Sequence, residues 1–137
     1  IDTLLNYLEA YRHEMVVIVA GYPAKMTQFI QNNEGLQRRF RDWLHFPDYT
    51  PEQLLEIALH MAQESGYAYS EQAMRALSFY LMNVYEYRDD TFANAGLVRN
   101  IVQKAIHNVD YRVAKQPQQP LTKHLIDEED LMLWESQ

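Results

Sequence analysis

The pattern of hydrophobic and polar positions changes character near residue 50. In residues 2–12, leucines recur at spacings of three and four, which predicts an amphipathic helix. Met15–Ala20 is apolar on both faces and rich in β-branched residues, as expected for a central strand of a parallel sheet. A short helix is predicted over 24–32, and Trp43–Phe46 reads as a second short strand. This first stretch is therefore typical of half an α/β layer.

From Thr50 onward the pattern is helical. Thr50-Pro51-Glu52-Gln53 combines a capping hydroxyl, a proline at the first helical position and a glutamine that can reach back, which predicts a helix ending at Gly66. Further helices are predicted to begin at Ser70 and Asn94, the second with an apolar stripe to about Lys115. A turn or linker over 117–120 precedes a terminal helix over 126–134, whose acidic first turn suits the helix dipole.

The predicted fold class is α+β and mainly α. Residues 1–49 form the remnant of a parallel α/β layer with two short strands and two helices. Residues 50–137 form a helical domain of about four helices.

Composition and charge exclude several classes of protein. The 137 residues are 47% hydrophobic and 23% charged, which is ordinary for a folded protein in water. Most of the net charge of −7 arises after residue 50, which argues against nucleic acid as a partner. There is no cysteine, and the five histidines share no short spacing, so no metal site is expected. The longest apolar run has six residues, so we expect no membrane span and a cytoplasmic location.

Five short motifs occur in a consecutive order that periodicity does not explain. They are Asp2-Thr3-Leu4-Leu5, Val16 to Pro23, Asn33 to Phe40, His45 to Leu55, and Phe92 to Ala95 with Val98-Arg99-Asn100. Through these motifs, residues 1 to about 115 resemble the AAA+ ATPases of the group typified by stage V sporulation protein K and the red-type, CbbX-like Rubisco activase. The resemblance implies that 1–49 is the C-terminal edge of the large α/β subdomain and 50–137 the helical lid.

Tyr22 lies where this family has the tip of its sensor-1 strand. The resemblance implies that this residue orients the attacking water or contacts the γ-phosphate. A tyrosine hydroxyl can donate a hydrogen bond, but asparagine is commoner there in AAA+ proteins. The alternative for Tyr22 is an aromatic residue that caps the end of a strand.

Arg38 and Arg39 carry the chemistry most typical of phosphoryl transfer. A guanidinium is always charged, and across a subunit boundary it can stabilise the charge that develops on the transferred phosphoryl group. Arg39, directly before Phe40, matches the arginine finger of the family best, and Arg38 is a neighbour that can share the role. The alternative is that both arginines belong to a solvated edge.

The start of the third lid helix departs from the family. Relatives carry Gly-Asn-Ala-Arg there, and the arginine, called sensor 2, reaches the nucleotide. Here the stretch is Ala93-Asn94-Ala95-Gly96, so Asn94 is retained and the arginine is lost. Arg99 lies one helical turn further on and can substitute in part, although packing or a salt bridge is the alternative role for it.

The chain contains no phosphate-binding loop. Its four glycines, at positions 21, 35, 66 and 96, are not followed by lysine, and the acidic pair that would hold magnesium is also missing. The sequence therefore resembles the C-terminal portion of an AAA+ ATPase without its Walker A and Walker B segments. We expect ATP and Mg²⁺ to bind the full-length protein, which would form a homo-oligomer, a hexamer in this family, and remodel a protein partner that these residues do not name.

Two rival functions remain open at this stage. The first is a non-catalytic helical interaction module descended from an AAA+ protein, which the loss of arginine at Gly96 favours. The second is an independent enzyme that uses Glu34 or the pair Asp89-Asp90, but neither has a base or nucleophile at a telling spacing. We also expect Val17, Val19 and Phe46 to be poorly covered in the isolated chain, so that it self-associates through this edge.

Overall fold

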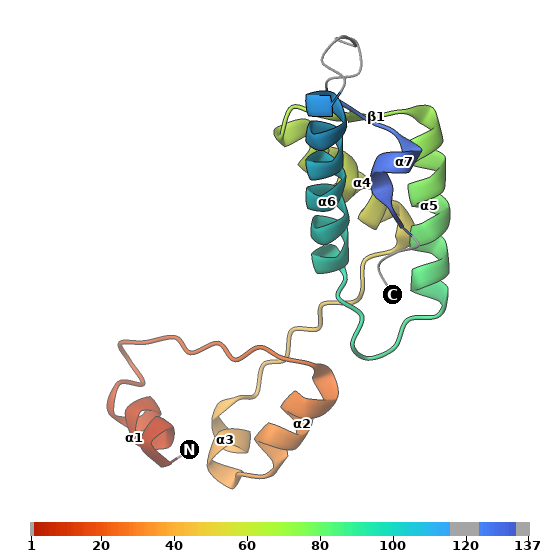
Figure 1. Cartoon of the computed structure of the whole chain (residues 1–137). Helices are drawn as coiled ribbons and strands as arrows, with labels where there is room; N and C mark the ends of the chain where they lie inside the picture. The colour runs from red at the N-terminus through yellow and green to blue at the C-terminus, as the bar shows by residue number, and fades with distance from the viewer. Residues whose placement is uncertain (1, 116–123, 134–137) are drawn as a thin grey trace. The chain divides into compact units, whose positions relative to one another are not determined.

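The computed structural model describes residues 2–115 and 124–133, and it confirms a mainly helical α+β chain (Figure 1). Contacts between residues divide it into two compact units, 1–46 and 47–137, which are described separately below. The elements of the N-terminal unit are α1 (Asp2–Ala10), α2 (Pro23–Gln31) and α3 (Glu34–Arg39). Those of the C-terminal unit are α4 (Pro51–Glu64), β1 (Ala68–Tyr69), α5 (Glu71–Glu86), α6 (Ala95–Lys115), β2 (Leu125–Ile126) and α7 (Glu128–Leu131).

The N-terminal unit holds three short helices on a small core. Among its described residues only Ile30 and Leu36 are buried. The predicted helix over 24–32 is present as α2, and a second helix, α3, which was not predicted, begins directly after Asn33. The side chain of Asn33 accepts hydrogen bonds from the backbone N–H groups of Gly35 (2.9 Å) and Leu36 (3.2 Å), so it is the N-cap of α3.

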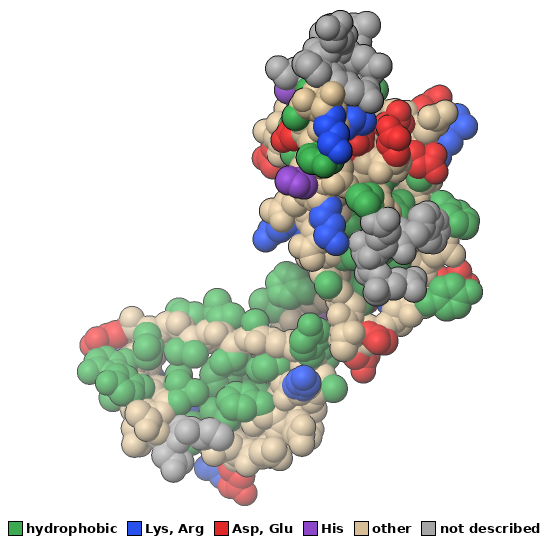
Figure 2. Space-filling model, viewed as in Figure 1, with side chains coloured by type: hydrophobic (Ala, Val, Ile, Leu, Met, Phe, Trp, Pro, Cys, Tyr) green, Lys and Arg blue, Asp and Glu red, His purple; other side chains and the backbone are tan. Residues whose placement is uncertain are grey.

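The two strands predicted in the N-terminal unit are wrong in position. No regular secondary structure is found at Met15–Ala20 or at Trp43–Phe46. A strand needs hydrogen bonds to a neighbouring strand, and among the described residues neither segment has such a neighbour. Val16 and Ile18 are 89% and 86% exposed, and Phe46 is 84% exposed as expected, whereas Val17 and Val19 are half-buried. Figure 2 shows hydrophobic side chains gathered over this unit.

The C-terminal unit is a four-helix arrangement that matches the predicted helices. α4 and α7 each contact both α5 and α6, so the apolar stripes of the longer helices close on one core (Figure 1). The buried core residues are Leu54, Ala58, Ala62, Ala73, Leu77, Tyr80, Leu81, Val98, Ile101, Val102, Ala105, Val109, Ile126, Leu131 and Leu133. The predicted capping box at Thr50 and Gln53 is confirmed, with both of its hydrogen bonds present.

Two short parallel strands of this unit were not predicted. β1 pairs with β2 in the register Ala68 with Leu125 and Tyr69 with Ile126. Strands of two residues are too short for an alternating pattern to identify them. The terminal helix is also shorter than predicted, Glu128–Leu131, and the predicted linker at 117–120 lies outside the described residues.

A buried ion pair fastens α7 to α6. Asp130 is 3% exposed, and its carboxylate accepts from Arg112 Nε at 3.0 Å and Arg112 NH2 at 2.7 Å. Arg112 NH2 also donates to the carbonyl oxygen of Leu125 at 3.0 Å. The carboxylate of Asp130 raises the pKa of the Arg112 guanidinium, since their hydrogen bond favours the charged form.

Candidate functional site

The residues predicted to act on a nucleotide fall in both units. Tyr22, Arg38 and Arg39 belong to the N-terminal unit, and Asn94 and Arg99 belong to the C-terminal unit. Each group is therefore described within its own unit.

Tyr22 precedes α2 rather than ending a strand. It is the N-cap residue of that helix, with extended backbone angles and no capping hydrogen bond from its side chain. The ring is 54% exposed, and the ammonium of Lys25 lies 5.8 Å from its centroid. A role for the Tyr22 hydroxyl as sensor 1 stays a prediction, and the exposed ring leaves it free to meet a ligand.

Arg39 is anchored within its own unit. Its guanidinium donates to Glu9 Oε2 at 2.5 Å, and a second nitrogen donates to the carbonyl oxygen of Gly35 at 3.2 Å. The Arg39 side chain is 34% exposed. A finger at this position would have to exchange Glu9 for a phosphate of the neighbouring site.

Arg38 is more accessible than Arg39. Its side chain is 78% exposed and lies 3.8 Å from Glu34 Oε2, one helical turn away. An exposed pair of this kind contributes only about 0.3–0.5 kcal/mol, so it would yield readily to a phosphate. The same pair leaves Glu34, considered above as an acid–base candidate, in a solvated contact.

Asn94 is held to the segment before α4. Its side-chain oxygen accepts from the backbone N–H of Tyr49 at 2.9 Å, and its side-chain nitrogen donates to Asp48 Oδ1 at 2.7 Å. The backbone of Asn94 has a φ of +50°, a conformation that asparagine tolerates better than most residues. The side-chain oxygen and nitrogen of the predicted nucleotide sensor are thus both bonded to residues 47–50, the segment that we call the linker from here on.

Arg88 is a residue that sequence reasoning missed. Its Nε donates to Asp48 Oδ2 at 2.9 Å, NH1 donates to the carbonyl oxygen of Tyr85 at 2.6 Å, and the guanidinium carbon lies 3.7 Å from the centroid of the Tyr85 ring. We call Asp48, Tyr85, Arg88 and Asn94 the linker clasp. No local motif points to it, because Asp48 precedes Arg88 by 40 residues and Asn94 by 46.

Arg99 and Gly96 lie on the first turns of α6. Arg99 is exposed, and among residues 2–115 and 124–133 it makes no hydrogen bond or ion pair; its role as a sensor and the alternative of packing or a salt bridge both stay predictions. Gly96 is also exposed, and a Cβ placed on it would meet only the Cβ of Ala93, at 3.8 Å. This end of α6 therefore has space around Gly96 and an exposed cation at Arg99. The backbone N–H groups of Gly96 and Leu97 at this end already donate to the carbonyl oxygens of Ala93 at 2.9 Å and Asn94 at 3.1 Å, so the side chain of Arg99 is the group here that suits an anion.

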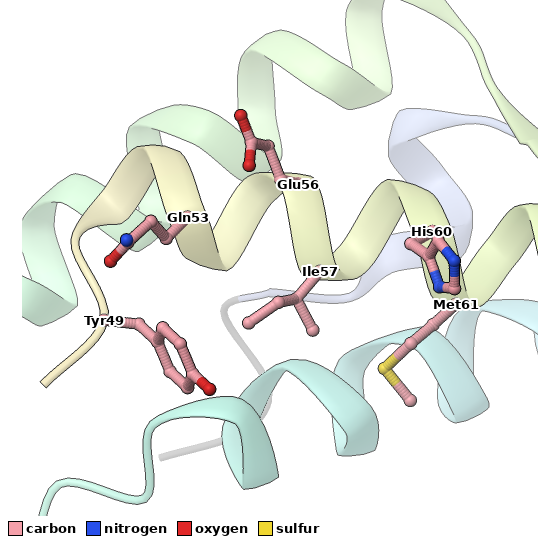
Figure 3. A pocket seen from close by; sticks show the side chains of 6 residues that line it. All are labelled: Tyr49, Gln53, Glu56, Ile57, His60 and Met61. Carbon is pink, nitrogen blue, oxygen red and sulfur yellow. The ribbon is translucent and has the colours of Figure 1, made fainter. Parts of the chain in front are cut away.

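A shallow groove of about 420 Å³ runs along α4 (Figure 3). Tyr49, Ile57 and Met61 supply its apolar lining and point toward α6, whereas Glu56 points away. The remaining lining residues are Gln53 and His60. Since the Tyr49 amide is bonded to Asn94, the groove ends beside the start of α6.

The loop before α6 is organised by Asp89. Its carboxylate accepts from the backbone N–H of Thr91 at 2.8 Å and from the Thr91 hydroxyl at 2.6 Å, and these bonds lower the pKa of Asp89. The carboxylate thus stays ionised as a turn residue, which gives no support to the acid–base role considered for Asp89-Asp90.

Two further kinds of site were sought in the described part of the chain. Residues 2–115 and 124–133 contain no group of three His, Cys, Asp or Glu side chains arranged to hold a metal ion. None of the helices within those ranges has both the length and the apolar character to span a membrane.

The chain is similar in sequence to several known proteins. Residues 50–137 match the family model of the AAA lid domain. Over 77% of this chain, the sequence is 42% identical to stage V sporulation protein K of Bacillus subtilis (strain 168). Over 96% of this chain, it is 36% identical to a CfxQ homolog of Galdieria sulphuraria. It is 38% identical to the chloroplastic ribulose bisphosphate carboxylase/oxygenase activase of Cyanidioschyzon merolae (strain NIES-3377 / 10D) over 90%. The matches cover 33%, 44% and 41% of these relatives, so the chain spans less than half of their length.

Proposed function

Since the chain belongs to the AAA+ ATPases through its lid domain, we propose that it is the C-terminal portion of a ring-forming ATPase that remodels other proteins. Residues 1–49 would supply the sensor-1 and arginine-finger edge of the large subdomain, and residues 50–137 would supply the lid. The full-length protein would be a cytoplasmic hexamer acting on a protein substrate. Its relatives of known name span more than twice the aligned length, which supports a longer chain.

Two exposed apolar segments of the N-terminal unit support the proposal that residues 1–49 are the edge of a larger subdomain. Val16 and Ile18 in one segment and Leu44 and Phe46 in the other are each more than 80% exposed, with Leu44 and Phe46 both at 84%. Apolar residues exposed in such a number are costly, at roughly 25 cal/mol per Å² of apolar surface. Further strands of the large subdomain would cover them and give both segments the hydrogen-bonded neighbours that strands require.

The observation that carries the proposal is the exposed Arg99 in the first turns of α6, the helix whose preceding residue, Asn94, is bonded to Tyr49 of the α4 groove. AAA+ relatives of this kind use ATP with Mg²⁺, and the residues present fit the lid side of such a site. The guanidinium of Arg99 suits the phosphates, and the apolar lining of the groove at Tyr49 and Ile57 suits the nucleoside. Bound ATP supplies the phosphoryl group that water attacks. The chain has no phosphate-binding loop of its own, so it would cover an ATP whose phosphates are bound by another segment of the full-length protein.

The arginines act in trans in this proposal. Arg39, with Arg38 beside it, would reach the ATP of the neighbouring subunit and stabilise the charge that develops on the transferred phosphoryl group. Arg39 would leave Glu9 only when that phosphate is present. A subunit interface would thus be needed for turnover, although each subunit binds nucleotide by itself.

The experiment compares ATP turnover and nucleotide affinity in the full-length protein and its variants. We expect Arg39→Ala to abolish turnover and to change nucleotide affinity less than twofold, as a residue acting in trans should. Arg12→Ala is the matched control, because Arg12 also faces Glu9, at 4.0 Å, and should leave turnover intact. If Arg39→Ala lost nucleotide binding as well, Arg39 would belong to its own subunit's site and the trans role would be wrong.

A second candidate function is a non-catalytic helical interaction module. Two observations favour it: the glycine at 96 in place of the family's arginine, and an exposed apolar face on α5, where Phe79 is 60% and Met82 55% exposed. Absence of ATP hydrolysis by the assembled full-length protein would favour this function over the first.

A further inference from the structure

The four residues that lead into α4 are each held in place. Pro47 has a fixed φ, and the side chain of Thr50 caps α4 by accepting from the N–H of Gln53 at 3.3 Å. Between them, Asp48 binds Arg88 and Asn94 through its two oxygens, and the backbone N–H of Tyr49 is bonded to Asn94. The linker therefore lies on the helical unit as a structured segment.

The clasp connects this linker to the start of α6. Asn94 directly precedes Ala95, the first residue of α6, and its side chain binds both Asp48 and Tyr49. A displacement of the linker would thus be transmitted to the helix end that bears Gly96 and Arg99. Arg88 fixes the other oxygen of Asp48 and so prevents that carboxylate from turning away from Asn94.

We propose that Arg88 is a positioning residue of the lid: by holding Asp48, it fixes the linker against the N-terminal end of α6 and couples motion of the linker to Arg99. This inference rests on the proposed function for its catalytic consequence. Its structural basis, the orientation of Asp48 and the bond to the Tyr49 amide, is independent of ATP.

The geometry favours arginine at position 88 over any other cation. The guanidinium donates in two directions, to Asp48 and to the Tyr85 carbonyl, while its flat face stacks on the Tyr85 ring. A lysine would keep the charge but would lose the fork and the stacking. Arg88→Lys should therefore restore only part of what Arg88→Ala removes.

The first test measures hydrogen exchange of the Tyr49 amide in the 137-residue chain. Arg88 does not touch this amide, so a purely local role would leave its exchange unchanged. We expect Arg88→Ala to speed the exchange at least tenfold and Arg88→Lys to have an intermediate effect. Arg75→Ala is the control, because Arg75 lies on α5, the helix that precedes Arg88, and its ion pair with Glu71 at 3.4 Å is exposed. Equal exchange in the Arg88→Ala variant and the wild type would overturn the inference.

The second test measures ATP turnover in the full-length protein. We expect Arg88→Ala to lower kcat about tenfold while the nucleotide Kd changes less than twofold, with Arg88→Lys between and Arg75→Ala at the wild-type rate. An unchanged kcat, or a matching loss of affinity, would overturn the positioning role. If the wild type itself does not hydrolyse ATP, the proposed function fails, and the exchange experiment still decides whether Arg88 holds the linker.

A third variant keeps the proposal testable if Arg88→Ala does not fold. Asn94→Gly removes both bonds to the linker but keeps a residue that adopts the positive φ without strain. If Arg88→Ala does not fold, Asn94→Gly should show the same faster exchange at Tyr49 and the same fall in kcat. Wild-type behaviour of a folded Asn94→Gly variant in both measurements would overturn the inference.

Discussion

The Ser70 hydroxyl donates a hydrogen bond to Asp127 Oδ1 at 2.7 Å, and this contact joins the N-caps of two helices that are far apart in sequence. Ser70 caps α5 by accepting from the N–H of Ala73 at 3.1 Å, and Asp127 caps α7 by accepting from the N–H of Glu128 at 2.9 Å. The backbone N–H of Ser70 also donates to the carbonyl oxygen of Ile126 at 2.9 Å. The C-terminal segment is thus fastened to the start of α5.

Ser70→Ala should destabilise the C-terminal unit. The variant loses the cap of α5 and the donor to Asp127 together, and loss of a cap alone costs about 1 kcal/mol, so we expect about 1–2 kcal/mol. The measurement is urea unfolding at pH 7. Ser78→Ala on the same helix is the control, because this mid-helix serine caps nothing and alanine is the better helix former. Equal loss in both variants would show that the Ser70 contact contributes nothing.

The effect of Ser70→Ala should depend on pH. The hydrogen bond from Ser70, followed by that from the Glu128 N–H, lowers the pKa of Asp127 in the folded chain. A lowered pKa stabilises the fold above the unfolded-state value of about 4, and this share is lost as the pH falls through the lower folded value. The difference in unfolding free energy between wild type and Ser70→Ala should therefore shrink between pH 5 and about pH 2. A constant difference over that range would contradict this assignment.

Asp130→Asn should be the most damaging of the substitutions considered for the C-terminal unit. It removes the 3%-exposed carboxylate that Arg112 binds at 2.7 Å, whereas Glu129 lies farther from the guanidinium, at 3.9 Å, and it weakens the bond to the Asp127 N–H. Removing one member of a buried pair costs about 3 kcal/mol or more. Urea unfolding with an unchanged m-value checks this figure. Asp90→Asn, in an exposed loop, should change the unfolding free energy by less than about 0.5 kcal/mol.

Most of the helical unit could be predicted from the sequence because its signals are local. The starts of α4 and α5 were predicted at Thr50 and Ser70, and the hydroxyls of both residues cap these helices, a role predicted for Thr50 alone. The strand predicted at Met15–Ala20 failed for a physical reason: its apolar pattern describes a burial that only a neighbouring strand can provide. The apolar pattern of Met15–Ala20 is typical of a strand covered on both faces, and the described residues do not provide that cover.

The sequence indicates candidate residues for the site but not the contacts that they make. Arg39 was identified from its motif, but its bond to Glu9 joins residues thirty positions apart and leaves no local signature. The linker clasp is similar, since Asp48 and Arg88 meet only after α4 and α5 have packed together. Long-range polar contacts of this kind depend on tertiary structure, which periodicity does not encode.

The isolated 137-residue chain should show no ATP-dependent change in thermal stability. None of its four glycines is followed by a lysine, so the backbone cradle that grips the phosphates is missing from the sequence. A ligand that binds only the folded state raises the free energy of unfolding, by about 2.7 kcal/mol at a hundredfold excess over Kd, and therefore raises the melting temperature. A thermal scan with millimolar ATP and Mg²⁺ checks this. A rise of several degrees would mean that Arg99 and the α4 groove suffice for binding, contrary to the proposal.

Gly96→Arg should strengthen nucleotide binding in the full-length protein. The position is exposed, a Cβ there meets only Ala93 at 3.8 Å, and the backbone φ is not positive, so the substitution needs no rearrangement. It would add a second cation one helical turn before Arg99, where the family carries its sensor-2 arginine. We expect several-fold tighter ATP binding, measured by equilibrium titration.

Gly96→Gln is the matched control for this prediction. It adds a long side chain without charge and, like arginine, replaces a glycine in a helix, which should stabilise the fold by about 0.5 kcal/mol in both variants. Tighter ATP binding in Gly96→Arg alone would therefore come from the charge beside the N-terminal end of α6. Equal affinity in the two variants would mean that this end of α6 does not face the phosphates, and Arg99 would then lose its assigned role as well.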